Sequence, residues 1–146
     1  MAPEGLSDRA WAWMKMRHPR SEQFWLYYPS AADGGFQELK VCDRAGYDPA
    51  VLIWHTCHAC RRGLIAKISI AVEWQRQGIG RRLIRRAMRG AEDYRWTTSA
   101  QSELAQQFFP VMARETGASF AARAGSCQHI RDGGQHLPKP RLEQTG

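Results

Sequence analysis

The sequence predicts a single mixed α/β domain in which antiparallel strands come first and a parallel β-α-β crossover follows. Its 146 residues are enough for one hydrophobic core and too few for two. Segments rich in aromatic and β-branched residues, separated by turn residues, occupy the first half, which is typical of antiparallel strands. From residue 79 onward the apolar residues recur at helical spacing, and strand-like segments alternate with helical ones. This alternation favours a parallel crossover beside the antiparallel strands.

The first half is predicted to hold one helix and four strands. Ser7 is a candidate N-cap for the helix, and Pro19 ends it. The turn residues Asp33, Gly34 and Gly35 separate the first two strands. The four strands are predicted over residues 24–28, 36–41, 50–56 and 64–72.

The second half is predicted to begin with an amphipathic helix that starts at Ile79 and is ended by Gly90. The elements expected after it are a strand over 94–98, a helix over 101–115 that Pro110 interrupts, and strands over 118–123 and 127–130. We expect residues 1–131 to form the domain. The polar residues 132–146, which include several glycines and prolines, are expected to form a disordered tail.

The composition is that of an ordinary globular protein, with 43% hydrophobic and 24% charged residues, and it excludes a disordered or fibrous chain. No segment approaches the ~20 apolar residues of a membrane-spanning helix. The N-terminal residues also lack the apolar stretch of a signal peptide. We therefore expect a cytoplasmic protein with no membrane partner. Four cysteines are too few for a disulfide scaffold.

The net charge of +7 is concentrated in the C-terminal part of the chain. Residues 1–60 hold six basic and seven acidic side chains, whereas residues 61–146 hold 15 basic and 7 acidic ones. Such an excess indicates a polyanionic partner or, alternatively, a solvated arginine-rich helix face. A nucleic acid that binds the arginine-rich helix is one candidate, but we do not expect it. That helix carries Arg81, Arg82, Arg85, Arg86 and Arg89.

The segment from Ile68 to Leu83 carries most of the functional signal. A predicted strand leads into a loop with Gly78 and Gly80, and an amphipathic helix follows at once. The first turn of a helix offers unpaired N–H groups and the positive end of the helix dipole, so this arrangement suits a phosphate group. The alternative is that the glycines only permit a tight turn. The residues match neither a P-loop nor a dinucleotide-binding fingerprint.

The residues from Val72 to Leu83 (VEWQRQGIGRRL) resemble the pyrophosphate-binding loop of the GNAT N-acetyltransferase family, whose pattern is Gln/Arg-x-x-Gly-x-Gly/Ala after a hydrophobic strand. The order of elements downstream is also similar, and Gly117 to Phe120 resembles the end of the family's next motif. The resemblance covers residues 50–123. It implies a GNAT-like mixed central sheet with an antiparallel first half, a splayed parallel pair and flanking helices. The part before the first hairpin is shorter here than in the family.

The resemblance implies that acetyl-CoA is the cosubstrate and that a primary amine attacks its thioester directly. The strand residues that would contact the pantetheine arm are Ile70, Ala71 and Val72. The loop residues that would hold the diphosphate are Gln75, Arg76, Gln77, Gly78, Ile79, Gly80 and Arg81, with Ser102 as a further cofactor contact. The alternative is a GNAT-like module that binds acyl-CoA, or regulates through it, with little catalysis. The sequence identifies neither the acceptor amine nor an oligomeric state.

The chain departs from the family at the groups that move protons. Where the family often has a Tyr that protonates the leaving thiolate, this chain has Phe109. Neither Phe109 nor its neighbour Phe108 has a proton to give, and both are expected in the core. Tyr47 and Tyr94 are possible substitutes. The candidate general bases are Glu73 and His55, with His58 as a further candidate.

Cys57 and Cys60 form a C-x-x-C pair on a predicted turn between strands. Such a turn can hold Zn²⁺ through two thiolates, with further ligands from His55 or His58, or from Cys127 and His129. We prefer the interpretation without a metal, in which the thiols are small half-buried side chains of a turn, because no second C-x-x-C is present. If zinc binds, its role is expected to be structural, because Cys60 is ten residues of extended chain from Ile70.

Overall fold

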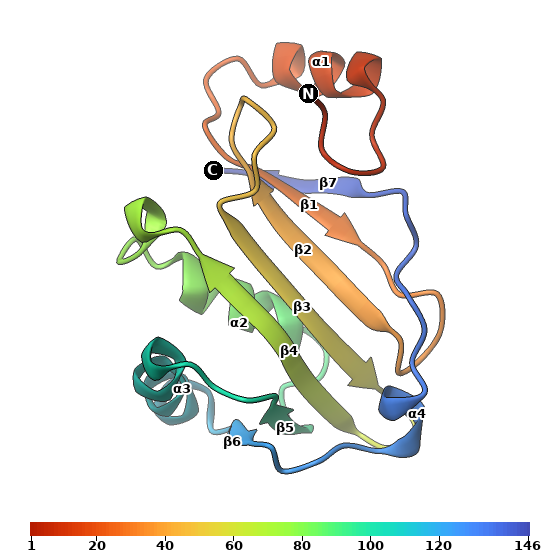
Figure 1. Ribbon diagram of the computed structural model, residues 1–146, viewed down its shortest axis with the longest axis vertical. Helices are drawn as coiled ribbons and strands as arrows, with labels where there is room; N and C mark the ends of the chain where they lie inside the picture. Colours follow the sequence, from red (N-terminus) through yellow and green to blue (C-terminus); the bar gives the residue numbers. More distant parts are fainter.

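A seven-stranded mixed sheet forms the centre of the molecule, and the helices pack against it (Figure 1). The computed structural model describes all 146 residues. The strand order is β6-β5-β4-β3-β2-β1-β7. No helix is both long and apolar enough to cross a lipid bilayer. The elements are α1 (Asp8–Arg17), β1 (Phe24–Tyr28), β2 (Phe36–Cys42), β3 (Ala50–Cys57), β4 (Arg62–Ile70), η1 (Val72–Trp74), α2 (Ile79–Met88), β5 (Arg95–Thr98), α3 (Glu103–Thr116), β6 (Ala121–Ala122), α4 (Gln128–Arg131) and β7 (Arg141–Thr145).

The fold class predicted from the sequence is confirmed. Strands β1 to β4 pair antiparallel with their neighbours, whereas β5 pairs parallel with β4, and β6 pairs parallel with β5. Helix α2 connects β4 to β5, and α3 connects β5 to β6. One helix, α1, precedes the first hairpin. The sheet therefore has the antiparallel first half, the parallel pair and the flanking helices of a GNAT-like arrangement.

The two faces of the sheet carry separate hydrophobic cores. Successive residues of a strand point to opposite faces, so Leu52 and Trp54 of β3 enter the larger core and His55 does not. The smaller core lies beneath α1, where Trp11 packs against side chains of β1 and β2. The larger core is completed by buried side chains of α2 and α3, namely Ile79, Leu83, Ile84, Ala87, Met88, Phe109 and Met112.

Helix α1 begins as its sequence predicts. Ser7 is the N-cap, and its hydroxyl accepts a hydrogen bond from the Ala10 amide at 3.0 Å. We expect Ser7→Ala to lower the free energy of unfolding by about 1 kcal/mol, because that amide loses its partner. Ser7→Asp should keep most of the stability, since a carboxylate can cap in the same way. Urea unfolding of the three proteins measures both effects, and equal stability of Ser7→Ala and the unaltered chain would contradict the prediction.

Helix α3 continues through Pro110, whereas the sequence predicted an interruption there. Pro110 is exposed, so the carbonyl that loses its helical hydrogen-bond donor lies on the solvent side of the helix and can bond to water. The C-terminal end of α3 is where the sequence predicts it. Gly117 ends the helix in the left-handed conformation at φ +84°.

The C-terminal quarter differs most from the prediction. The strand expected over 118–123 is only the two residues of β6, and the segment expected as a strand over 127–130 is helix α4, with Cys127 as its N-cap. Within the expected disordered tail, 132–146, residues Arg141–Thr145 instead form β7, which pairs antiparallel with the edge of β1. Its composition is polar, but strand pairing depends on backbone groups, and Leu142 packs against the smaller core.

Candidate functional site

A cavity of about 580 Å³ lies where β4 and β5 separate. The parallel ladder between them has only four residue pairs and ends at Ile65 and Thr98. The Ser99 amide then bonds to the Ile65 carbonyl at 3.0 Å and its hydroxyl to the Ala66 carbonyl at 2.7 Å, after which the chain turns into α3. Beyond this point β4 continues to Ile70 without β5 beside it. The free edge of β4 therefore lines the cavity.

A β-bulge in β4 marks the place where the two strands separate. Ile53 of β3 pairs with Lys67, but the next residue, Trp54, pairs with Ile65, so Ala66 is an extra residue. A bulge bends its strand and increases the local twist. The bend lies at the last contact between β4 and β5 and turns the rest of β4 away from β5.

The loop between β4 and α2 forms one end of the cavity. Arg76 and Gly78 both adopt left-handed backbone conformations, at φ +63° and +78°, and Gly78 is the N-cap of α2. No side chain caps this helix end, so the first amides of α2 have no side-chain partner. The Gln75 side chain bonds back to the Ile70 carbonyl at 3.0 Å. The loop thus presents an uncapped helix N-terminus to the cavity, which is the arrangement that favours an anion.

Gly80 lets α2 approach α3 and β4 closely. A Cβ atom at this position would lie 3.1 Å from Phe108 Cε1 and 3.3 Å from Ile70 Cδ1. The cavity between these elements has a largely apolar wall. That wall is formed by Ile68, Ile70, Trp74, Leu104, Phe108, Val111 and Met112.

Two arginines bring positive charge to the cavity. Arg76 is exposed at its edge and forms no ion pair. The Arg81 Nε lies 2.8 and 3.1 Å from the two carboxylate oxygens of Glu115. This hydrogen bond lowers the pKa of Glu115, so its carboxylate is the charged form that holds Arg81 in place. Arg76 therefore has a free charge to offer an anion, and Arg81 has one that is shared.

The structure brings most of the predicted cofactor residues to this cavity. Those that line it are Ile70, Gln75, Arg76, Gly78, Ile79, Gly80, Arg81 and Ser102. Ala71, Val72 and Gln77 do not line it. Val72 is 79% exposed, and the Gln77 side chain donates to the Glu73 carbonyl at 3.1 Å. The Ser102 hydroxyl caps α3 by accepting the Ala105 amide at 3.2 Å.

Neither predicted general base lines the cavity. Glu73 is exposed in η1, on the outer side of the loop. His55 is half-buried on β3, where its Nδ1 lies 3.0 Å from the Gly34 carbonyl oxygen. Burial lowers the pKa of His55, so the neutral imidazole is favoured at neutral pH.

The aromatic residues considered for proton transfer lie elsewhere as well. Phe109 is 3% exposed in the larger core, as expected, while Phe108 lines the cavity. Tyr47 is 74% exposed in the loop between β2 and β3. The Tyr94 hydroxyl lies 2.8 Å from His58 Nδ1, beside the turn between β3 and β4. None of the considered side chains other than Phe108 therefore reaches the cavity.

Sequence reasoning missed the wall that α3 contributes. Leu104, Phe108 and Val111 lie at helical spacing and all face the cavity, together with Gln107. The spacing itself indicates this wall, because these residues form a second apolar stripe on α3 beside the stripe that enters the core. Leu104 is 62% exposed at the mouth of this cavity.

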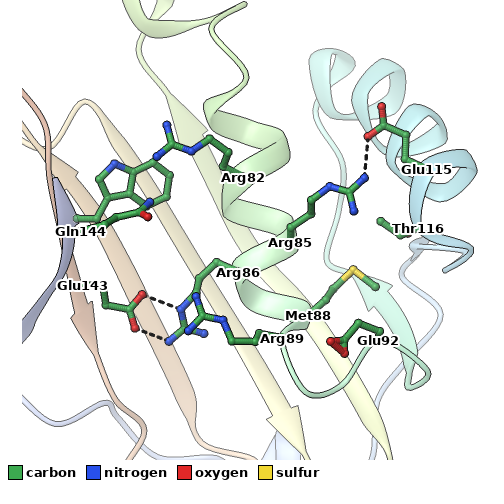
Figure 2. Close-up of a pocket in the computed structure, with 11 residues that line it drawn as sticks. Arg82, Arg85, Arg86, Met88, Arg89, Glu92, Glu115, Thr116, Glu143 and Gln144 are labelled. Atoms are coloured by element: carbon green, nitrogen blue, oxygen red, sulfur yellow. Dashed lines mark hydrogen bonds and ion pairs between the residues drawn. The ribbon is translucent and has the colours of Figure 1, made fainter. Parts of the chain in front are cut away.

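A second cavity, of about 540 Å³, lies between α2, α3 and β7 and is rich in charge (Figure 2). In Figure 2, Arg85 points to Glu115 and Arg86 points to Glu143, and the ion-pair distances are 3.6 and 2.6 Å. The Arg82 guanidinium lies 4.4 Å from the ring centre of Trp25. The carboxylates reduce the charge that this helix face offers to a polyanion.

The structure also brings together one of the ligand sets considered for zinc. Cys57, Cys60, Cys127 and His129 place their ligand atoms within 4.8 Å of one another. His55 and His58 are outside this group.

The comparisons with known proteins give similarity at the level of structure. No protein-family profile matches the sequence, and no curated protein matches it significantly. The fold is similar to that of a proposed acetyltransferase from Deinococcus radiodurans R1, with a TM-score of 0.46 and 14% identity over 72% of this chain and 66% of that chain. It is also similar to nourseothricin acetyltransferase, with a TM-score of 0.35 and 15% identity over 50% of this chain and 57% of that chain. The chain thus spans less than two thirds of the length of either protein.

Proposed function

We propose that the chain is an acetyl-CoA-dependent N-acetyltransferase that moves an acetyl group to a primary amine by direct attack. The observation that carries this proposal is the cavity between β4 and β5. One end of the cavity is the uncapped N-terminus of α2, with Arg76 beside it. One side of the cavity is the free edge of β4. A diphosphate attached to a long, mostly apolar arm has the chemistry to match both parts.

The residues of the site have separable roles in this proposal. The amides of Gly78 to Arg81 and the Arg76 charge bind the diphosphate, and the unpaired edge of β4 near Ile70 offers backbone groups to the pantetheine arm. The arm then leads toward Ala66 and Ser99, where the strands separate. Positioning of the thioester beside an amine supplies the main rate advantage of direct attack, and the reaction needs no covalent enzyme intermediate.

The second candidate function is a GNAT-like module that binds acyl-CoA with little catalysis. A specific observation favours it: Glu73, His55, Tyr47 and Tyr94 all lie outside the cavity. Protonation of the leaving thiolate would then fall to solvent. Binding and turnover must therefore be measured separately.

Thermal unfolding with and without ligand tests the binding step. At 100 times its Kd, acetyl-CoA is expected to stabilise the chain by about 2.7 kcal/mol, which raises the unfolding midpoint by about 5–10 °C. CoA should act similarly, because it carries the same diphosphate. Pantetheine, which lacks the diphosphate, should stabilise far less. Absence of any shift with acetyl-CoA and CoA would contradict both candidate functions.

Release of free thiol from acetyl-CoA in the presence of an amine panel tests the chemical step. Amine-dependent thiol release supports the N-acetyltransferase. A thermal shift without thiol release across peptides, aminoglycosides and polyamines supports the binding module instead. Hydrolysis that is independent of amine would count against direct attack.

A further inference from the structure

Four potential metal ligands from two distant segments converge at one end of the sheet. Cys57 and Cys60 flank the turn between β3 and β4, whereas Cys127 and His129 lie at the start of α4. All four ligand atoms lie within 4.8 Å of one another, and Cys60 Sγ is 3.3 Å from His129 Nδ1. We propose that these residues form a structural Zn²⁺ site that fastens the tip of the β3–β4 hairpin to the C-terminal segment.

The donor set and its size both suit zinc. Zn–S bonds of about 2.3 Å and Zn–N bonds of about 2.0–2.1 Å give a tetrahedron with edges of about 3.4–3.8 Å. The observed spacing needs only an inward movement of about 1 Å. Three thiolates and one imidazole are soft and borderline ligands, which favour Zn²⁺ over Mg²⁺ or Ca²⁺. Four protein ligands fill the tetrahedron, as in structural rather than catalytic zinc sites.

The first ligand pair is held in a defined turn. Asp33 accepts hydrogen bonds from the amides of His58 and Ala59, at 2.9 and 3.2 Å. Arg61, directly after the second cysteine, adopts a left-handed conformation at φ +53°. The anchored turn brings the two sulfur atoms close together.

The second ligand pair is placed by close backbone packing. Ile130, the residue directly after His129, is buried and anchors α4. A Cβ atom at Gly34 would lie 2.8 Å from the His129 carbonyl oxygen, and one at Gly133 would collide with the Gly34 carbonyl. The segment with Cys127 and His129 thus rests against the same Asp33–Gly35 turn that anchors the first pair. One turn positions all four ligands.

The location of the cluster indicates what the metal does. In Figure 1, α4 lies beside the tip of β3 and β4, at the end of the sheet away from the beginning of α2. The nine residues of β4 span about 30 Å at ~3.3 Å per residue, so the metal is remote from the proposed acyl-CoA cavity. After α4 the chain is bonded to β2 and to the end of β1 on its way to β7. Zinc would fix the start of that path, where Cys60 and His129 are exposed.

Metal analysis and metal replacement on the full chain test the site. We expect one zinc per chain after purification in reducing buffer without a chelator. Chelation should lower the unfolding midpoint, and zinc at about 1,000 times its Kd should raise it again by about 10 °C. Co²⁺ should replace zinc with the thiolate charge-transfer absorption and the visible bands of a tetrahedral site.

A matched pair of histidine variants tests the ligand set. His129→Ala should weaken Co²⁺ binding by roughly 100-fold or more, since even indirect partners of a metal site are worth 10- to 100-fold. His58→Ala, in the hairpin turn itself, should leave the cobalt spectrum unchanged. Equal effects of the two substitutions would overturn the proposed ligands. Failure of the unaltered chain to take up one Zn²⁺ or Co²⁺ would overturn the site, whether or not the variants fold, and would leave acetyl-CoA binding untouched.

Discussion

Gly78→Glu is expected to weaken acetyl-CoA binding by about 100-fold or more, whereas Gly90→Glu should leave it unchanged. Gly78 lines the cavity at the N-terminus of α2, where the proposed diphosphate binds. The introduced carboxylate would repel a bound phosphate about 6 Å away by about 3 kcal/mol, at an effective dielectric constant of about 20. That energy corresponds to slightly more than 100-fold in Kd.

Gly90 matches Gly78 in backbone conformation and in the free space around a Cβ atom. Gly78 and Gly90 have φ values of +78° and +76°, and a Cβ at either position has no neighbour within 4 Å. Glutamate therefore meets the same backbone strain, about 1–2 kcal/mol, at both positions. Gly90 follows the C-terminal end of α2, away from the cavity. Gly90→Glu should be the less stable of the two free proteins by up to about 1 kcal/mol, because a carboxylate is favourable at the N-terminus of a helix and unfavourable at its C-terminus, and only Gly78→Glu should lose ligand binding.

Isothermal titration with acetyl-CoA, combined with thermal unfolding of the free proteins, separates strain from ligand repulsion. Equal affinities of Gly78→Glu and the unaltered chain would show that the ligand does not use this helix end. An equal loss of affinity in both variants would show that the strain, and not the added charge at the loop, is responsible.

The elements that the sequence predicts well are those whose pattern is local. The apolar residues of α2 recur at helical spacing and are all buried, and the loop before it takes the turn that its glycines permit. The cavity follows from these parts, because a strand, a glycine loop and a helix in succession place the helix N-terminus beside the strand end.

The elements that the sequence does not predict depend on distant partners. Strand β7 is polar and exists because β1 has a free edge and because Arg86 of α2 faces Glu143. The sequence names Cys127 and His129 as only one of the alternative ligand pairs for the hairpin turn, because the residues of the turn do not indicate which distant segment approaches it.

The candidate general bases show a second limit of prediction from the sequence, which is the direction in which a side chain points. Glu73 is close along the chain to the loop, but in η1 it is exposed and does not line the cavity. His55 has suitable chemistry, but the alternation of β3 places it on the face opposite to Leu52 and Trp54. Closeness along the chain and suitable residue type do not establish which face of an element a side chain occupies.

Glu143→Gln is expected to lower the free energy of unfolding by about 2–3 kcal/mol. The Arg86 Nε and Nη2 atoms bond to the two carboxylate oxygens of Glu143 at 2.7 and 2.6 Å, and the two side chains are only 14% and 13% exposed. The Arg86 guanidinium also lies against the rings of Tyr27 and Trp54. An amide at position 143 keeps one hydrogen bond but leaves a half-buried cation without its counter-charge, which is costly.

Glu115→Gln is the matched control for this substitution. Glu115 lines the same charged cavity as Glu143 and pairs with Arg85, as Figure 2 shows. It also pairs with Arg81, and both arginine side chains are about half exposed to solvent. Exposed ion pairs contribute little to stability. The unfolding midpoint should therefore fall by about 5–10 °C for Glu143→Gln and change little for Glu115→Gln. In Glu143→Gln, proteolysis should also cleave residues 132–146 faster, because β7 carries this side chain.

The contribution of Glu143 to the free energy of unfolding should decrease at low pH. Burial alone would raise the pKa of Glu143, but the hydrogen bonds and charge of Arg86, with Arg89 and Arg141 further away, bring it below the ordinary value. The folded chain then binds this proton less readily than the unfolded chain, so the stabilisation is complete above the ordinary glutamate pKa of about 4.3. It is lost as the pH falls through the lower pKa of the folded state. Chemical unfolding of the unaltered chain and of Glu143→Gln between pH 7 and pH 3 measures this effect. The difference in their free energies of unfolding should be constant down to about pH 5 and should shrink below it. It shrinks because a protonated carboxyl, like an amide, leaves the Arg86 charge unpaired. A difference that stays constant to pH 3 would show that shape, and not the charge pair, makes Glu143 important.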